Sequence, residues 1–378
     1  MKIPFNWPYM TGKELYNIAQ CHFNGRLAGD GPFTALCHQW LQQYSGAERA
    51  LLTNSCTAAL EMSALLLDIQ PGDEVIMPSY TFVSTANAFV LRGAVPVFVD
   101  IRPDTLNIDE QLIAPAITSK TKAIVPVHYA GVSCEMDTIL QLAKKYELAV
   151  VEDAAQGVMS SYKGRTLGSM GDLGAFSFHE TKNVISGEGG ALLVNNVRYA
   201  TAAEIIREKG TNRSQYFRGE IDKYTWQEHG SSFLPGELIA AFLWAQLEEA
   251  KQITSRRLSS WNYYHAHFAD AERMGLLSRP VIPSDCVHNA HMYYVVLNPA
   301  LDRQPVLDGL KALGIGAVFH YVPLHSAPAG VKFGRVEGNM SNTDLLSAQL
   351  IRLPLWVGIS ETQQDFVAES LMKLLGKS

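Results

Sequence analysis

The most constraining feature of the sequence is a repeated alternation, between residues 50 and 194, of short apolar runs with segments of helical periodicity. The apolar runs, such as EVIMP, VPVFVDI, KAIVPVHYA and LAVVEDAA, are continuous, which is typical of strands buried on both faces of a sheet. Parallel strands need a crossover between them, and the helical segments supply it. The pattern therefore predicts an α/β fold with a mostly parallel central sheet and helices on both faces.

A long helical stretch at residues 236–272 is expected to link two domains. A chain of 378 residues exceeds the size at which one hydrophobic core usually stops growing. The later segments mix strand-like and helical patterns, as in a small α+β domain. We therefore predict a large α/β domain at residues 1–250 and a small C-terminal α+β domain at residues 251–378. The polar, aromatic segment at residues 210–226 is expected to be a long functional loop.

Composition and charge narrow the range of partners. Apolar residues make up 47% of the chain and charged residues 18%, which excludes disorder and favours extensive burial, some of it between subunits. The net charge is −6 without any run of Lys and Arg, so neither nucleic acid nor an anionic membrane is the expected partner. No signal peptide or membrane span is expected, because no apolar run of about 18 residues occurs. Five cysteines without a C-x-x-C pair favour a reducing cytoplasm over a disulfide framework or zinc ribbon.

The clearest chemical signal is the acidic end of the apolar strand LAVVED. In open α/β sheets, ligands bind beyond the carboxyl ends of the strands. Adjacent strand residues point to opposite faces, so Glu152 and Asp153 cannot share a role and one of them should face the ligand. The alternative is that the aspartate caps a following helix.

Three further segments are expected at the same edge of the sheet. Lys182 follows the apolar run FSF and precedes glycines that allow close backbone approach, so its amine could bind a carbonyl carbon covalently, unless it is a solvated turn lysine. The segment TNSCTAA joins a strand to a helix and offers backbone N–H groups to an anion, unless Ser55 or Thr57 only caps the helix. Phe82 follows the strand EVIMP and taken alone would be a core residue.

Together these segments supply what pyridoxal 5′-phosphate requires: a lysine, a carboxylate for the ring nitrogen, donors for the phosphate and a stacking ring. The motifs SCTAA, SYTF, EDAAQ, FSFHETKN and GEGG, in this order, resemble the DegT/DnrJ sugar-nucleotide aminotransferase family. Matching features continue to RLPLW at residues 352–356, so the likeness covers essentially the whole chain. The resemblance implies an aspartate-aminotransferase-like fold (fold type I), pyridoxal phosphate as cofactor, a transaminase activity and a homodimer with a shared active site.

The resemblance also implies roles for individual residues. Lys182 matches the lysine that carries the cofactor, and Asp153 matches the partner of its ring nitrogen. The other implied cofactor-binding residues are Ser55, Cys56, Thr57, Phe82, Gln156, Ser177 and Ser232. Ser232 lies in GSSFLP, where the family often has G-x-N-x-[RK]-M with an asparagine that reaches the phosphate of the partner subunit.

Substrate contacts are expected from three residues. Tyr321 and His325 follow the strand-like run GAVF in a segment that lies near the substrate in the resembling family. Arg213 could bind a diphosphate through bidentate hydrogen bonds, although a solvated loop arginine is the alternative.

Three more segments, GDGPF at 29–33, PVHYAG at 126–131 and GTNRSQ at 210–215, are similar to family members that act on a 4-keto sugar. They imply transfer of the amino group of L-glutamate to C4 of dTDP-4-keto-6-deoxy-D-glucose, giving dTDP-4-amino-4,6-dideoxy-D-galactose. A 3-keto or differently configured nucleotide sugar is an open alternative. A pyridoxal-dependent sugar dehydratase is another, but such relatives have histidine in place of Lys182. A cofactor-binding regulator has no support, because no basic patch is present.

The spacing of glycines and histidines in the sequence argues against a dinucleotide-binding site and against a metal site. A dinucleotide-binding fold needs G-x-G-x-x-G after its first strand, and the turn here is TNSCTA. The histidine pairs 265/267 and 288/291 lack a third ligand at a recognisable spacing. No metal site is therefore predicted, and these histidines are expected to be ordinary core or surface residues.

Overall fold

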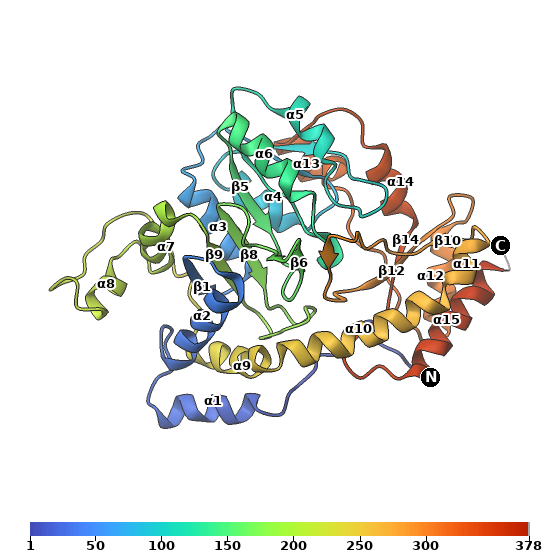
Figure 1. Ribbon diagram of the computed structural model, residues 1–378, viewed down its shortest axis with the longest axis horizontal. Coiled ribbons are helices and arrows are strands. Elements are labelled where there is room, and N and C mark those ends of the chain that lie inside the picture. The colour runs from blue at the N-terminus through green and yellow to red at the C-terminus, as the bar shows by residue number, and fades with distance from the viewer. Residues whose placement is uncertain (377–378) are drawn as a thin grey trace.

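The computed structural model describes residues 1–376 and is built around an eight-stranded sheet with helices on both faces (Figure 1). Strand β9 runs antiparallel to its neighbours β1 and β8, and the strands from β8 to β13 are all parallel. The predicted mostly parallel α/β sheet is confirmed. In order across the sheet, the strands are β1 (Arg49–Thr53), β9 (Gly190–Val194), β8 (Leu173–Ser177), β5 (Ala149–Asp153), β4 (Thr121–Ile124), β2 (Glu74–Pro78), β3 (Val95–Val99) and β13 (Arg335–Val336).

Alternate residues of the central strands enter two separate cores, one on each face of this sheet. In β2, Val75 and Met77 belong to one core and Ile76 to the other. This two-sided burial explains why the strands are continuous apolar runs in the sequence. The first core includes α3 (Cys56–Leu66), α4 (Val83–Val90) and α7 (Ala200–Arg207), and the second includes α1 (Glu14–Phe23), α2 (Pro32–Ser45), α5 (Ile113–Ala116), α6 (Met136–Tyr146) and α9 (Glu237–Glu248).

The C-terminal part forms a third core around a small antiparallel sheet. This sheet consists of β10 (Leu277–Ser278), β12 (Tyr293–Leu297) and β14 (Leu350–Leu353). Helix α10 leads to it from α9 along one side of the molecule (Figure 1). The helices that contribute to this core are α10 (Ala250–His267), α11 (Ala269–Arg273), α12 (Arg303–Ala312) and α15 (Glu361–Leu375). Helix α14 (Ser341–Gln349) contacts β12, whereas α13 (Pro328–Phe333) contacts β3 of the large sheet. A second small sheet contains β6 (Ser161–Tyr162), β7 (Arg165–Thr166) and β11 (Cys286–Val287).

The segment at 251–378 is not wholly separate from the large sheet. Strand β13 returns to its edge and pairs with β3. The guanidinium of Arg335 holds it there by donating to the carboxylate of Glu74, with Nε–Oε1 and Nη2–Oε2 distances of 2.8 and 3.0 Å.

Residues 210–229, which we call the arm, extend away from the large sheet and contain the short helix α8 (Arg213–Phe217) (Figure 1). The expected long loop is therefore a projecting segment. Within residues 1–376, no helix combines the length and apolar character needed to cross a membrane.

The carboxyl ends of β2, β5 and β8 meet at one edge of the sheet, and residues 316–324 lie against it. That segment does not form the expected strand. Val318 makes one bridge to Arg352, and the short 3-10 helix η4 (Leu324–Ser326) follows. The chain thus delivers side chains from the C-terminal part to the ends of the parallel strands.

Candidate active site

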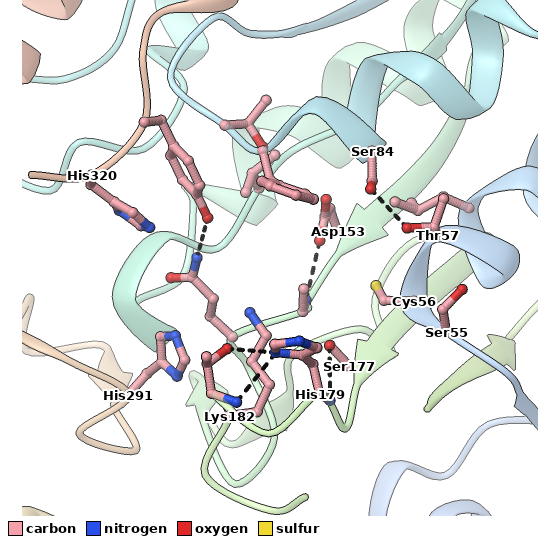
Figure 2. Close-up of a pocket in the computed structure, with 18 of the residues that line it drawn as sticks. Ser55, Cys56, Thr57, Ser84, Asp153, Ser177, His179, Lys182, His291 and His320 are labelled. Atoms are coloured by element: carbon pink, nitrogen blue, oxygen red, sulfur yellow. Dashed lines mark hydrogen bonds between the residues drawn. The ribbon is translucent and has the colours of Figure 1, made fainter. Parts of the chain in front are cut away.

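A cavity of about 700 Å³ lies at the carboxyl ends of these parallel strands (Figure 2). This volume is within the range of small-molecule and cofactor sites. Most of the residues predicted from the sequence line it: Ser55, Cys56, Thr57, Phe82, Asp153, Gln156, Ser177, Lys182 and Tyr321.

The structure resolves the choice between the two acidic residues at the end of β5. Glu152 is fully buried on the face away from the cavity, where it accepts backbone N–H groups from Gly168, Met170 and Gly171 at 2.6–2.8 Å. His128 also donates to it, with an Nε2–Oε2 distance of 2.9 Å. Asp153, one residue later, lines the cavity. Glu152 therefore anchors loops, and Asp153 is the carboxylate that can meet a ligand.

Asp153 is held in place by its neighbours. Thr85 of α4 donates its hydroxyl to Oδ2 at 2.7 Å, and the N–H of Ala155 donates to Oδ1 at 3.2 Å. Because the Thr85 hydroxyl gives its proton to a carboxylate, it accepts the hydroxyl of Thr81, 2.8 Å away. The carboxylate is thus oriented before any ligand binds.

Lys182 lies in the turn after β8 and reaches into the same cavity. Its Nζ has no hydrogen-bond partner among the described residues. Burial lowers the pKa of the Lys182 amine, the neighbouring Cys56 and the negative charge of Asp153 partly offset this, and the charge of Arg352 lowers the pKa further. A lysine with a lowered pKa is available as a free amine, which is the nucleophilic form.

The opposite end of the cavity is built to hold an anion. Ser55 caps α3 by accepting the N–H of Ala58 at 3.1 Å, so the following backbone N–H groups face the cavity. Thr57 and Ser84 add hydroxyl groups that lie 2.7 Å apart. Strand β9 approaches closely here, because a Cβ on Gly190 would lie 2.4 Å from the nitrogen of Cys56. The capping alternative and the anion-binding interpretation of TNSCTAA therefore describe the same geometry.

Cys56 contributes its backbone and not a reactive thiolate. Burial, together with the charge of Asp153, raises its pKa well above the ordinary thiol value. The thiol stays protonated at neutral pH.

Aromatic side chains line one wall of the cavity. Phe82, at the N-terminus of α4, is 56% exposed although it lines the cavity, so its ring face is free to stack on a ligand. Gln156 donates through Nε2 to the Tyr321 hydroxyl at 2.9 Å and accepts the N–H of Ala130 at 2.6 Å. Tyr321 stacks on His320 with ring centres 3.6 Å apart.

Lysine, carboxylate, anion-binding helix terminus and stacking ring are therefore present in one cavity of suitable volume, so the residues fit pyridoxal phosphate. Lys182 would hold the aldehyde carbon, Asp153 the ring nitrogen, and Ser55, Cys56, Thr57 and Ser177 the phosphate.

Three predicted residues do not line this cavity in the chain that carries them, and two of these are Arg213 and Ser232. Arg213 is in the arm and donates through Nη1 to Glu208 Oε1 at 3.0 Å. Ser232 is exposed, and its carbonyl accepts from the Asn54 amide at 3.3 Å. Neither can contact a ligand held by Lys182 of the same chain without moving.

His325 also differs from its expected place. Its Nδ1 lies 2.7 Å from the hydroxyl of Ser79, and its Nε2 lies 3.3 Å from Asp344. His320 occupies the cavity wall instead, with Nδ1 2.8 Å from the Tyr129 hydroxyl. The cavity is therefore lined by His320 and not by His325, and a contact between His325 and the substrate stays a prediction.

Several further residues that line the cavity were not predicted from the sequence, among them three histidines, a serine and an arginine. Ser84 and His179 are close to recognised motifs, so their positions beside SYTF and FSF were an available signal. His320, His291 and Arg352 come from the C-terminal part and are brought in only by tertiary packing. His291 in particular is not the ordinary histidine that was expected. No cluster of three His, Cys, Asp or Glu side chains suited to a metal ion occurs within residues 1–376.

Comparison with known proteins places this site in a family. The model of the DegT/DnrJ/EryC1/StrS aminotransferase family matches residues 8–372. The chain is 33% identical over 381 residues to the spore coat polysaccharide biosynthesis protein SpsC of Bacillus subtilis, covering 99% of this chain and 97% of that protein. It is 36% identical over 355 residues to the uncharacterized protein MJ1066 of Methanocaldococcus jannaschii, covering 92% and 91%.

A solved structure agrees over the whole chain. The putative sugar aminotransferase Spr1654 from Streptococcus pneumoniae, in its PMP-form, is 27% identical with a TM-score of 0.92, covering 100% of this chain and 98% of that chain. Its PLP-form gives a TM-score of 0.91 at 26% identity, covering 100% and 99%.

Proposed function

The chain belongs to the DegT/DnrJ/EryC1/StrS aminotransferase family and is a pyridoxal phosphate-dependent sugar aminotransferase of fold type I, and on this premise we propose its substrates. The enzyme transfers the amino group of L-glutamate to C4 of dTDP-4-keto-6-deoxy-D-glucose and forms dTDP-4-amino-4,6-dideoxy-D-galactose. The observation that carries this proposal is Lys182 in the cavity beside Asp153, together with the similarity of GDGPF, PVHYAG and GTNRSQ to dTDP-4-amino-4,6-dideoxygalactose transaminase.

Bound pyridoxal phosphate supplies an electron sink for a carbon that loses its proton. Asp153 would accept a hydrogen bond from the ring nitrogen of the cofactor and favour its protonated, charged form. With cofactor and substrate bound, the Lys182 amine would take the proton from one carbon as a base and deliver it to the next as an acid. Its lowered pKa favours the first of these steps.

Arg352 supports L-glutamate as the amino donor. Its guanidinium lines the cavity over the ring of Phe5, 4.5 Å from the ring centre, and no acceptor for it exists among the described residues. Burial lowers the pKa of this guanidinium, a cost that an anionic ligand would offset. A carboxylate is the ligand that matches a guanidinium with two parallel hydrogen bonds.

We also infer that the active unit is a homodimer that completes the site. The arm carries exposed aromatic residues, as subunit contacts often do. Arg213 and Ser232 lie outside the cavity of their own chain, so they are available to the substrate and phosphate bound by the partner subunit.

The cellular setting is part of the same proposal. All five cysteines are free, as expected in the reducing cytoplasm. We place the product in polysaccharide biosynthesis, the process named for the relative from Bacillus subtilis.

The test is a single turnover of the amino form of the enzyme with a panel of keto-sugar nucleotides, followed by proton NMR of the product. A small H3–H4 coupling after reaction with the 4-keto sugar supports axial nitrogen, as in the galacto product. A large coupling, or turnover of only a 3-keto isomer, contradicts the proposed substrate. In the same preparation, borohydride reduction and peptide mapping should place the cofactor on Lys182, and a label on another lysine would remove its assigned role.

A further inference from the structure

His291 is a cavity residue to which the mechanism above gives no task. It is buried, with 5% of its surface exposed, and lines the same part of the cavity as Lys182 (Figure 2). Its Nδ1 lies 3.1 Å from Oδ1 of Asn183, the residue that follows the lysine. Its Nε2 has no hydrogen-bond partner in the part of the chain that the structure describes.

Neighbouring groups determine which nitrogen of His291 carries the proton. Asn183 donates through Nδ2 to the carbonyl of Asn289 at 2.6 Å, and a carbonyl can only accept. The oxygen of the Asn183 amide must therefore face His291, so Nδ1 of the imidazole is the donor. In a neutral imidazole the other nitrogen is then an acceptor. Nε2 of His291 thus presents a lone pair to the cavity.

The imidazole stays neutral because its surroundings oppose protonation. Burial lowers the pKa of His291 well below its ordinary value, and the positive charges of Lys182, Arg257 and Arg352, together with His320, act in the same direction. Lys182 lies in the turn after β8, Arg257 in α10, Arg352 in β14 and His320 in the segment before η4.

The backbone that carries His291 is fixed at several points. Arg257 of α10 donates to the carbonyls of Ala290 and His291 at 3.0 and 2.7 Å. The side chain of Asn289 donates to the carbonyls of Gln156 and Val158 at 2.8 and 2.7 Å. Three buried side chains thus hold the ring relative to the cavity.

We propose that His291 is a positioning residue for Lys182: when the released amine becomes an ammonium group, it donates an N–H to Nε2 of His291. This rests on the proposed catalytic role of Lys182. Neither Nζ of Lys182 nor Nε2 of His291 has a hydrogen-bond partner among the described residues, so each is available to the other, and the amine is an ammonium group after it takes a proton from the substrate. His291 accepts a hydrogen bond and no proton, so Lys182 passes on the same proton and the balance is unchanged.

The test measures the titration of Lys182 in the apoenzyme, which needs no turnover. Trace acetylation over a pH series, read by peptide mass spectrometry and normalised to the exposed Lys311, gives the midpoint for Lys182. Met and Gln have similar lengths, but only Gln keeps a strong acceptor near the position of Nε2. Loss of the acceptor destabilises the ammonium, so His291→Met should lower the midpoint by about one pH unit, whereas His291→Gln should stay near the wild type.

The matched control is His288→Met, in the same segment but packed on Trp261 with ring centres 4.5 Å apart, which should leave the midpoint unchanged. An unchanged midpoint in His291→Met, or equal falls in the Met and Gln variants, would overturn the proposal. If His291→Met does not fold, Asn183→Leu takes its place. This variant keeps the imidazole but removes the amide oxygen that fixes the proton on Nδ1 of His291. A fall in its midpoint supports the proposal and no change overturns it. Borohydride mapping and product NMR on the wild type test the proposed function separately.

Discussion

Asp153 and Glu152 are adjacent, chemically alike and assigned opposite tasks, so they form a matched pair for mutation. We expect Asp153→Asn to keep the fold and bound cofactor but to lower kcat by about 10²–10³-fold, because only the charge that faces the ring nitrogen is lost. Glu152→Gln should instead retain most of kcat and lose about 3 kcal/mol of stability, because a buried carboxylate with four donors is disrupted. Steady-state kinetics and thermal unfolding distinguish the two. Equal kinetic effects would remove the distinction.

Arg352 provides a second test at this scale, because its predicted ligand is used in only one half-reaction. Arg352→Gln should raise the KM for L-glutamate roughly 100-fold, the cost of a lost charged hydrogen-bond pair. The reaction of the amino form with the keto sugar should change little. Absorbance changes of the cofactor follow each half-reaction separately. A defect confined to the sugar half-reaction would reassign Arg352 to the diphosphate.

The sequence predicts individual residues well where a motif and its strand are neighbours. Asp153 is the last residue of β5, and Phe82 and Lys182 lie in the short turns that follow β2 and β8, so a correct sheet places all three at the same edge. His291 and Arg352 could not be found in this way, because they enter the cavity from the segment just before β12 and from β14, which belong to the C-terminal part. No pattern in their local sequence predicts that contact.

Among the helices, the start of α2 depends on a single residue of α9. The Glu237 carboxylate is buried and accepts the N–H groups of Gly31, Phe33 and Thr34 at 2.9–3.0 Å, as well as the Thr34 hydroxyl. Glu237→Gln should therefore lower the free energy of unfolding by about 2–4 kcal/mol. Urea denaturation at fixed protein concentration measures this. Glu248→Gln, on the same helix but with only a 3.7 Å ion pair, should cost less than about 0.5 kcal/mol, and equal losses would contradict the assigned cap.

The strands of the large sheet were predicted correctly because each is a buried apolar run. The prediction failed for a segment whose conformation places side chains in the active-site cavity. The large sheet follows from its continuous apolar strands, whereas GAVFHYVPL looks like a strand and is not one. His320 and Tyr321 stack on one another and both line the cavity. Adjacent residues of a strand would point to opposite faces, so this segment must leave strand geometry to deliver both rings.

In a monomer, the arm would project into solvent without a protein partner. Phe217 and Trp226 are 64% and 79% exposed on a segment that projects from the body (Figure 1). Large apolar side chains displayed on a projecting segment are typical of subunit contacts. Because Arg213 belongs to the same arm and does not line the cavity of its own chain, we expect the arm to link assembly to activity in the proposed homodimer.

We therefore expect the double variant Phe217→Ser/Trp226→Ser to weaken the dimer and to lose activity in parallel. Loss of these contacts costs about 3 kcal/mol, or roughly 100-fold in dissociation constant. Sedimentation velocity over a dilution series, with activity assayed at each concentration, measures both effects. Val331→Ser, equally exposed at 69% but on α13, is the control and should change neither. A monomer with full activity would contradict a site completed by the partner, whereas activity that falls with the dimer fraction would show that each cavity needs the arm of its partner.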